Sequence, residues 1–261
     1  MTNDKKLVMI SNDDGVGASG LHHLIDCTRD VLPDADIIAV APEGHNSGMS
    51  SAISVNSPLR ITRRPDYNGA SIYAVSGTPV DCVKLGIHAV MPRKPDIMLS
   101  GINHGSNAGN SLIYSGTMGA AMEACMIGIP AIGYSLLDHA HDADFTQTTL
   151  FIAKITRYVL NHGLPTDICL NVNFPAGCTP KGIKVTHGAA GRWTEEYEKY
   201  TDPHGRAFYW LTGNYVKENP DDAGSDMYWL DRGWASVSPV HPDQSANSEI
   251  PALAAFLDGG L

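Results

Sequence analysis

Residues 7–20 read LVMISNDDGVGASG and contain the pattern that decides the fold. Four apolar residues, typical of a buried strand, pass into a polar turn and then into glycines. The next stretch, GLHHLIDCTRDVL at 20–32, carries apolar residues at helical spacing and stops before Pro33. This succession of strand, turn and helix predicts the first unit of an α/β domain.

The same alternation continues along the chain. Further strands are expected at 35–42, 95–101, 128–137 and 168–175. Helices are expected at Ser115–Met126, where Gly128 and Pro130 close the segment, and at about Phe145–Asn161. Strands that alternate with helices predict a Rossmann-like, doubly wound and mostly parallel sheet.

The sequence changes character after residue 178. KGIKVTH (181–187) and RAFYWLTG (206–213) are expected to be extended on either side of a turn at 202–205, and DMYWLDRGWASVSPV (226–240) is expected to be extended as well. We therefore expect one domain over residues 1–261, with an α/β core at 1–178 and a C-terminal extension at 179–261 that includes an antiparallel β-hairpin arm. The aromatic residues of the extension indicate either an interface with another subunit or core packing.

Composition limits the choice of partners and compartment. The 261 residues carry a formal charge of −10, which disfavours nucleic-acid polymers and anionic membranes. No apolar run approaches the roughly 20 residues that span a bilayer, and the short apolar run after Lys5 and Lys6 does not fit a signal peptide. Five scattered cysteines favour reduced thiols over disulfides. We expect a cytoplasmic protein.

Two adjacent carboxylates, Asp13 and Asp14, follow the first strand. Open α/β sheets bind ligands at the carboxyl ends of their strands, and Gly15 allows the chain to turn so that both side chains can converge on one hard cation. The alternative is an Asx turn that caps the following helix.

The run Gly15–Gly20 also matches the G-x-G-x-x-G pattern of dinucleotide-binding folds. A nicotinamide-dependent oxidoreductase is therefore the competing interpretation. The charges of Asp13 and Asp14 would lie beside the pyrophosphate, and Pro42 precedes Glu43 where a ribose contact is usual. Both features count against a dinucleotide.

Three later segments offer oxygen ligands and anion sites. The loop at 41–51 supplies hydroxyl groups, and the loop SGINHGSNAGN (100–110) interleaves glycine with asparagine. The start of the helix at Ser115, Gly116 and Thr117 combines free backbone N–H groups, two hydroxyls and small side chains, which favours phosphate. Ordinary turns and helix capping are the alternatives.

Together, SNDDGVGASGL, APEGHNSGMSSAIS, VSGTPVDCVKLG, SGINHGSNAGN and IYSGTMGAAMEA resemble the SurE survival-protein family of 5′-nucleotidases. The resemblance implies one divalent ion per subunit, Mg²⁺ or Mn²⁺, with four ligands: Asp13, Asp14, Ser47 and Asn103. It also implies a phosphate site made of Asn107, Ser115, Gly116 and Thr117. The segment 109–112 departs from the family, since many relatives carry acidic residues there.

The resemblance implies that the protein releases phosphate from nucleoside 5′- or 3′-monophosphates, and in some members from short polyphosphate. Homodimers or homotetramers built through an exchanged C-terminal arm are also implied. As a mechanistic hypothesis, Asp13 orients the attacking water or accepts its proton, while Asp14 is mainly a ligand. A covalent aspartyl-phosphate route and a nucleotide-binding module without catalysis are the alternatives.

Several histidines and one cysteine lie in or near the proposed loops. His45 and His104 lie in the proposed loops and are candidates for substrate contact. The run at 138–144, DHAHDAD, is interpreted as a solvated loop before a helix rather than a metal cluster. Cys125 is expected to pack in the interior.

Overall fold

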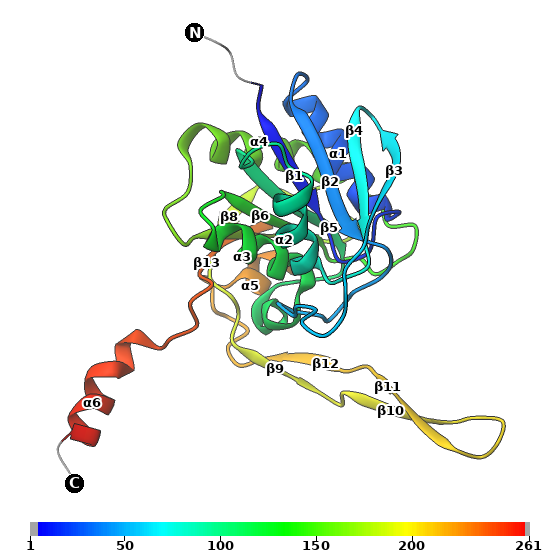
Figure 1. Cartoon of the computed structure of the whole chain (residues 1–261). Coiled ribbons are helices and arrows are strands. Elements are labelled where there is room, and N and C mark those ends of the chain that lie inside the picture. Colours follow the sequence, from blue (N-terminus) through cyan, green and yellow to red (C-terminus); the bar gives the residue numbers. More distant parts are fainter. Residues whose placement is uncertain (1–4, 259–261) are drawn as a thin grey trace.

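The computed structural model describes residues 5–258 and shows a central β-sheet between two layers of helices (Figure 1). The strands are β1 Leu7–Ser11, β2 Asp36–Pro42, β3 Ile61–Tyr67, β4 Ala70–Val75, β5 Ile97–His104, β6 Ala131–Leu136, β7 Cys169–Phe174, β8 Ile183–Val185, β9 Gly191–Thr194, β10 Tyr197–Thr201, β11 Ala207–Leu211, β12 Asn214–Lys217 and β13 Ala235–Val240. The α-helices are α1 Ser19–Val31, α2 Pro79–Ala89, α3 Gly116–Met126, α4 Thr149–His162, α5 Asp226–Leu230 and α6 Ile250–Asp258.

Nine strands form the main sheet in the order β3-β4-β2-β1-β5-β6-β7-β13-β8. The six from β4 to β7 run parallel, whereas β3 and β13 pair antiparallel with their inner neighbours at the two sides. The chain leaves β1 toward β2 and later returns to the opposite side of β1 through β5. The strand order therefore reverses between β1 and β5, and this switch point is where such sheets bind ligands. The predicted Rossmann-like, mostly parallel sheet is confirmed.

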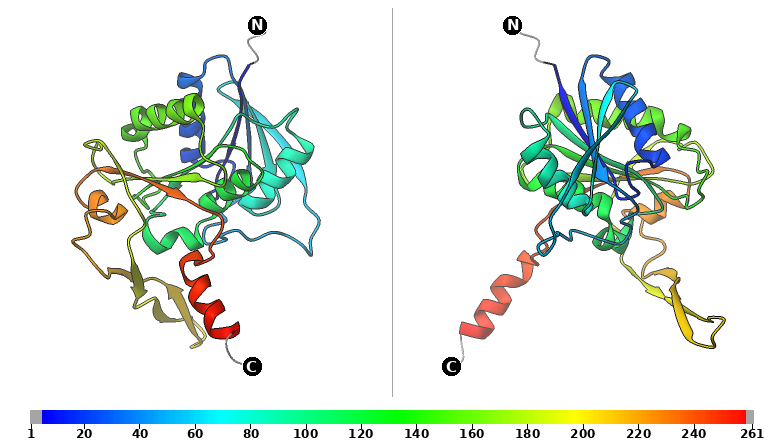
Figure 2. Two further views of the ribbon diagram at one scale, coloured as in Figure 1. Left: turned by 90° about the vertical axis from the view of Figure 1, so that its left-hand side faces the viewer. Right: turned by 45° about the vertical axis from the view of Figure 1, so that its right-hand side comes forward.

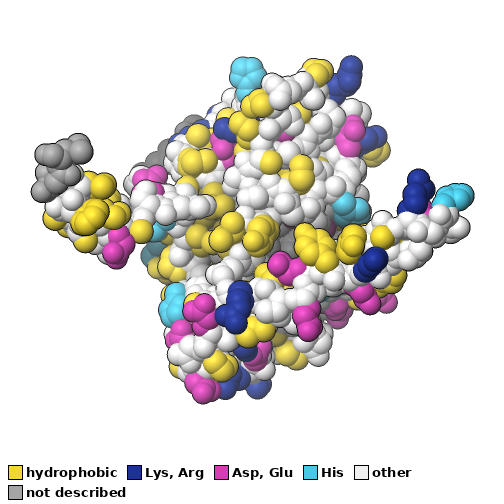
Figure 3. All heavy atoms as spheres, turned by 90° about the horizontal axis from the view of Figure 1, so that it is seen from below, with side chains coloured by type: hydrophobic (Ala, Val, Ile, Leu, Met, Phe, Trp, Pro, Cys, Tyr) yellow, Lys and Arg dark blue, Asp and Glu magenta, His cyan; other side chains and the backbone are white. Residues whose placement is uncertain are grey.

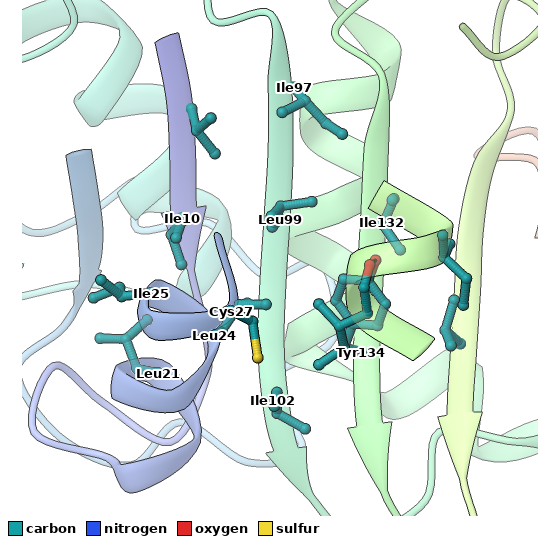
Figure 4. Close-up of a cluster of buried hydrophobic side chains, with 14 of the residues drawn as sticks. Ile10, Leu21, Leu24, Ile25, Cys27, Ile97, Leu99, Ile102, Ile132 and Tyr134 are labelled. Carbon is teal, nitrogen blue, oxygen red and sulfur yellow. Dashed lines mark hydrogen bonds between the residues drawn. The ribbon is translucent and has the colours of Figure 1, made fainter. Parts of the chain in front are cut away.

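Helices cover both faces of the sheet because each has one apolar side. α1 and α4 bury Leu21, Leu24 and Ile152 against one face, where they meet sheet residues such as Leu99 (Figure 4). α2 and α3 cover the other face, where their buried residues pack against sheet residues such as Met98. The predicted helices at 20–32, 115–126 and 145–161 correspond to α1, α3 and α4. A short 3₁₀ turn, Thr146–Thr148, occupies the start of the last of these.

The part of the chain after residue 178 differs from expectation in two places. The turn at 202–205 is present, since Gly205 N donates to Asp202 O at 3.0 Å. However, β11 pairs with β10, not with KGIKVTH, whose strand β8 joins β13 at the edge of the main sheet. The expectation of an extended segment is wrong for DMYWL, which is helix α5; only β13 is extended. The buried carboxylate of Asp226 accepts backbone N–H groups there, and this stabilises a helical turn against the strand preference of the aromatic residues.

Two segments project from the body of the protein. Strands β9 to β12 form a long hairpin, and α6 stands apart from the sheet in every view (Figures 1 and 2). Hydrophobic side chains lie on both projections (Figure 3). No helix within residues 5–258 is long and apolar enough to cross a bilayer. All five cysteines are unpaired.

Candidate active site

A cleft of about 540 Å³ opens at the carboxyl ends of β1 and β5. The candidate His104 lines it, and so do five of the eight residues predicted as metal or phosphate ligands: Asp13, Ser47, Asn103, Asn107 and Ser115. They come from the turn after β1, the loop after β2, the end of β5 and the start of α3. The topology of the sheet therefore brings together residues that are more than 100 positions apart in the chain.

Asp13 is held in one orientation by the start of α3. The hydroxyl of Thr117 donates a 2.5 Å hydrogen bond to Asp13 Oδ1, and the side chain is almost fully buried, at 3% exposure. Burial raises the pKa of Asp13 from 3.8 to about 6; the charge of Asp14 adds to the rise, and the hydrogen bonds from Thr117 oppose it. A buried carboxylate of this kind is stabilised by a cation.

Asp14 occupies the other side of the same turn. Its Oδ2 accepts the backbone N–H of His104 at 3.1 Å, and the Nδ1 atom of His45 lies 3.8 Å from its Oδ1. Asp14 is buried, at 8% exposure, and it is not among the residues that line the cleft. The His104 ring packs edge-on against Phe145, with 4.9 Å between the ring centroids. Both histidines predicted as candidates thus lie beside the carboxylates.

The turn that carries both carboxylates is fixed by Asn12. Its side chain donates to Gly15 O at 2.9 Å and accepts from Gly15 N at 3.2 Å. Gly15 has φ +102°, and a Cβ atom there would lie 3.1 Å from the backbone of Gly44. A Cβ atom on Gly20 would lie 2.1 Å from Ile102 O. Close packing therefore accounts for these glycines of the dinucleotide-like pattern without a bound pyrophosphate.

The oxygen atoms of the cleft suit a hard divalent cation. Asn103 donates its amide N–H to Gly105 O at 2.8 Å, which leaves its side-chain oxygen as an acceptor at the cleft. Ser47 offers a hydroxyl from the exposed loop after β2. Carboxylate, hydroxyl and amide oxygens are typical ligands of Mg²⁺ and Mn²⁺. Within residues 5–258, no group of three or more His, Cys, Asp or Glu side chains is placed to hold a metal ion, so Ser and Asn would have to complete any ligand set.

The predicted phosphate site divides into a cleft-lining part and a buried part. Ser115 caps α3 by accepting from Met118 N at 3.0 Å, and it lines the cleft. The first turn of a helix presents N–H groups without intrahelical partners, which favour an anion. Gly116 and Thr117 lie behind this surface, packed on Asp13, and the Thr117 hydroxyl bonds to Asp13.

Asn107 is positioned by neighbouring strands. Its backbone N–H donates to Asn173 Oδ1 at 2.9 Å, and its backbone oxygen accepts from Asn171 at 2.8 Å. Its side-chain nitrogen donates to Ser135 Oγ at 2.7 Å. These bonds fix the loop between β5 and α3 at the edge of the cleft.

Sequence reasoning did not select two groups of cleft residues. His139 lies in the run that was interpreted as a solvated loop, yet its ring packs directly on Gly105 and lines the cleft. The other group belongs to the hairpin: Trp193, Glu196, Tyr197, Leu211 and Thr212. The high aromatic content after residue 178 was a signal for the second group, but it did not show which aromatics would face the site.

The fold and the cleft define a Rossmann-like α/β protein with two buried carboxylates and the start of a helix at the switch point of its sheet. A family model described as "Survival protein SurE" matches residues 8–195. The 5′-nucleotidase SurE of Phocaeicola vulgatus is 43% identical over 246 residues, which cover 94% of this chain and 95% of that protein. The 5′-nucleotidase SurE of Christiangramia forsetii is 43% identical, with 98% of each chain covered.

A solved structure agrees with these sequence matches. The crystal structure of the SurE protein from Aquifex aeolicus matches with a TM-score of 0.81 at 32% identity, covering 97% of this chain and 99% of that one. The chain therefore belongs to the SurE survival-protein family.

Proposed function

We propose that the protein is a divalent-metal-dependent phosphatase that hydrolyses nucleoside 5′-monophosphates to nucleoside and inorganic phosphate. The observation that supports the proposal is the packing of α3 on Asp13, so that a buried carboxylate and Ser115 at the start of a helix line one cleft. The relatives from Phocaeicola vulgatus and Christiangramia forsetii are 5′-nucleotidases, which supports the same activity.

In this proposal, the residues in and beside the cleft have separate roles in binding the metal ion and the phosphate. Asp13, Asp14, Ser47 and Asn103 hold one Mg²⁺ or Mn²⁺ ion. When bound, the ion neutralises charge on the phosphoryl oxygens. Asn107, Ser115 and the backbone N–H groups of the first turn of α3, at Gly116 and Thr117, hold the phosphate.

Asp13 orients the attacking water or accepts its proton, and Thr117 fixes its carboxylate for this task. The proposed activity extends to nucleoside 3′-monophosphates and short polyphosphate, which present a phosphate group to the same site.

Phosphate release from a panel of nucleoside 5′- and 3′-monophosphates and tripolyphosphate tests the proposal. The panel is run with Mg²⁺, with Mn²⁺ and with a chelator. We expect phosphate release to require the metal. We expect Asp13→Asn to abolish release while the circular dichroism spectrum stays unchanged. Binding of monophosphates without release would instead identify a non-catalytic nucleotide-binding module.

We further propose a cytoplasmic homodimer or homotetramer in which the extension at 179–261 forms the subunit interface. The support is the exposed apolar surface of α6, where Leu253 is 58% and Phe256 is 81% exposed. Exposed apolar patches of this kind are commonly covered by another chain. The five unpaired cysteines fit a reducing compartment.

A further inference from the structure

The hairpin contributes one wall of the cleft, and this wall carries two aromatic side chains. Trp193, Tyr197 and Leu211 line the cleft there, together with the polar Glu196 and Thr212. Tyr197 and Leu211 are direct partners in the antiparallel pair β10–β11, so their side chains share one face of the hairpin. The cleft therefore joins a polar part, which includes Asp13 and Ser115, to a part with aromatic side chains on the hairpin.

The base of the hairpin is fastened to the loop that carries Asn107. Asp226, which is 1% exposed, accepts backbone N–H groups from Gly109 at 2.8 Å and from Ala189 at 2.9 Å. Asn110 donates to Gly191 O at 2.5 Å. One buried carboxylate and one amide thus tie the two walls of the cleft together.

Tyr215 fixes the aromatic wall itself. Its hydroxyl donates to Ala189 O at 2.8 Å, and the ring of Trp193 packs edge-on against it, with 5.6 Å between the centroids. Trp193 is thereby held in place, yet it remains 37% exposed, and Tyr197 is 68% exposed. Aromatic faces that remain accessible at a binding cleft, as the fixed Trp193 and the more exposed Tyr197 do, are suited to stacking on a flat ring.

A nucleoside monophosphate has the matching division of chemistry, with an anionic phosphate at one end and a flat base at the other. Base stacking on aromatic side chains tolerates every base, since each base has a π-face. We propose that Trp193 and Tyr197 form the nucleobase subsite of this cleft. This inference rests on the proposed function, in which Asp13 and Ser115 hold the phosphate end.

The test compares a substrate with a base and a substrate without one. The variants are Trp193→Ala and Tyr197→Ala, and the substrates are adenosine 5′-monophosphate and ribose 5-phosphate. We expect kcat/KM for the nucleotide to fall roughly tenfold in each variant relative to kcat/KM for the sugar phosphate, as for the loss of one stacked base. The ratio of the two constants is used because general losses of folding or assembly cancel in it.

Trp210→Ala is the matched control. Trp210 is 63% exposed on the same hairpin, but it neighbours Leu211 in β11 and so faces the opposite side. Its substrate ratio should equal that of the parent protein. If the parent hydrolyses both substrates and Trp193→Ala and Tyr197→Ala leave the ratio unchanged, the nucleobase subsite is overturned and the proposed function stands. If the parent releases phosphate from neither substrate, the proposed function fails and the subsite with it.

Discussion

Gly116 lies so close to Asp13 that a Cβ atom added to the glycine would stand 2.8 Å from the Cβ atom of Asp13. Gly116→Ala should therefore displace the carboxylate or the first turn of α3. Because a misplacement of about 1 Å can cost on the order of a hundredfold in rate, we expect kcat to fall by at least tenfold, roughly, with the fold retained. Gly17→Ala is the control, since nothing lies within 4 Å of a Cβ atom there. Equal kcat values for the two variants would contradict the close packing.

The ionised carboxylate of Asp13 should lower the free energy of unfolding of the metal-free protein at neutral pH. Its pKa in the folded state is about 6, above the ordinary 3.8, so the folded protein binds this proton more tightly than the unfolded chain. The resulting stability is complete below about pH 4 and is lost as the pH rises through about 6. With chelator at pH 7.5, Asp13→Asn should raise the free energy of unfolding by up to about 3 kcal/mol.

Urea titrations at pH 7.5 and pH 4 check this expectation, since the gain should disappear at the lower pH. The same substitution should abolish phosphate release. A variant that is less stable than the parent at pH 7.5 would mean that burial of the charge is not the dominant effect.

Asn103 and Asn107 should separate metal binding from substrate binding. Asn103→Ala removes a proposed metal ligand and should raise the Mn²⁺ concentration for half-maximal activity. Asn107→Ala removes a proposed contact to a charged phosphate, worth about 1.5–3 kcal/mol, and should raise KM roughly 10- to 100-fold at saturating Mn²⁺. Activity measured over a grid of metal and substrate concentrations distinguishes the two. Identical patterns for both variants would refute this division of roles.

Asp226 should control the attachment of the hairpin. Asp226→Ala leaves the buried N–H groups of Gly109 and Ala189 without their acceptor, at a cost of about 1–3 kcal/mol for each. Faster amide hydrogen exchange in residues 189–217 is the expected result. The control is Asp222→Ala, in the turn before α5 and more exposed, which accepts a hydrogen bond from Gly224 N. Unchanged exchange in the Asp226 variant would show that other contacts carry the hairpin.

Charges placed on α6 should weaken subunit assembly. Leu253→Asp combined with Phe256→Asp converts two exposed apolar positions into charged ones, which would be unfavourable in an apolar interface. Light scattering after size-exclusion chromatography should then report a smaller mass than for the parent. Lys154→Asp, on the surface of α4, is a charge-changing control outside the extension. A parent and double variant of equal mass would rule out α6 as the interface.

The layout of the sheet could be predicted from the sequence because its signals are local. The apolar runs and glycine-rich turns near Asp13 and Asn103 identify two strand ends, and the small residues after Ser115 identify the start of a helix. The topology of parallel sheets places such strand ends at one edge. The structure brings these residues into one cleft. Their individual roles toward metal and phosphate remain predictions.

Contacts that depend on distant segments could not be predicted in this way. The helix at Asp226–Leu230 forms where aromatic residues favour a strand, because Asp226 meets amides from two other loops. His139 reaches the cleft only because Gly105, far away in the chain, leaves room for its ring. The facing of Trp193 and Tyr197 follows from the path of the hairpin, which no local pattern encodes.

Asp226 accepts hydrogen bonds from backbone N–H groups, so this attachment does not depend on the side chains of the hairpin. Side chains at the tip and on the faces of the hairpin can therefore be substituted while this backbone attachment is retained. We therefore expect substitutions within residues 193–212 to change the substrate preference without a change in the anchorage by Asp226.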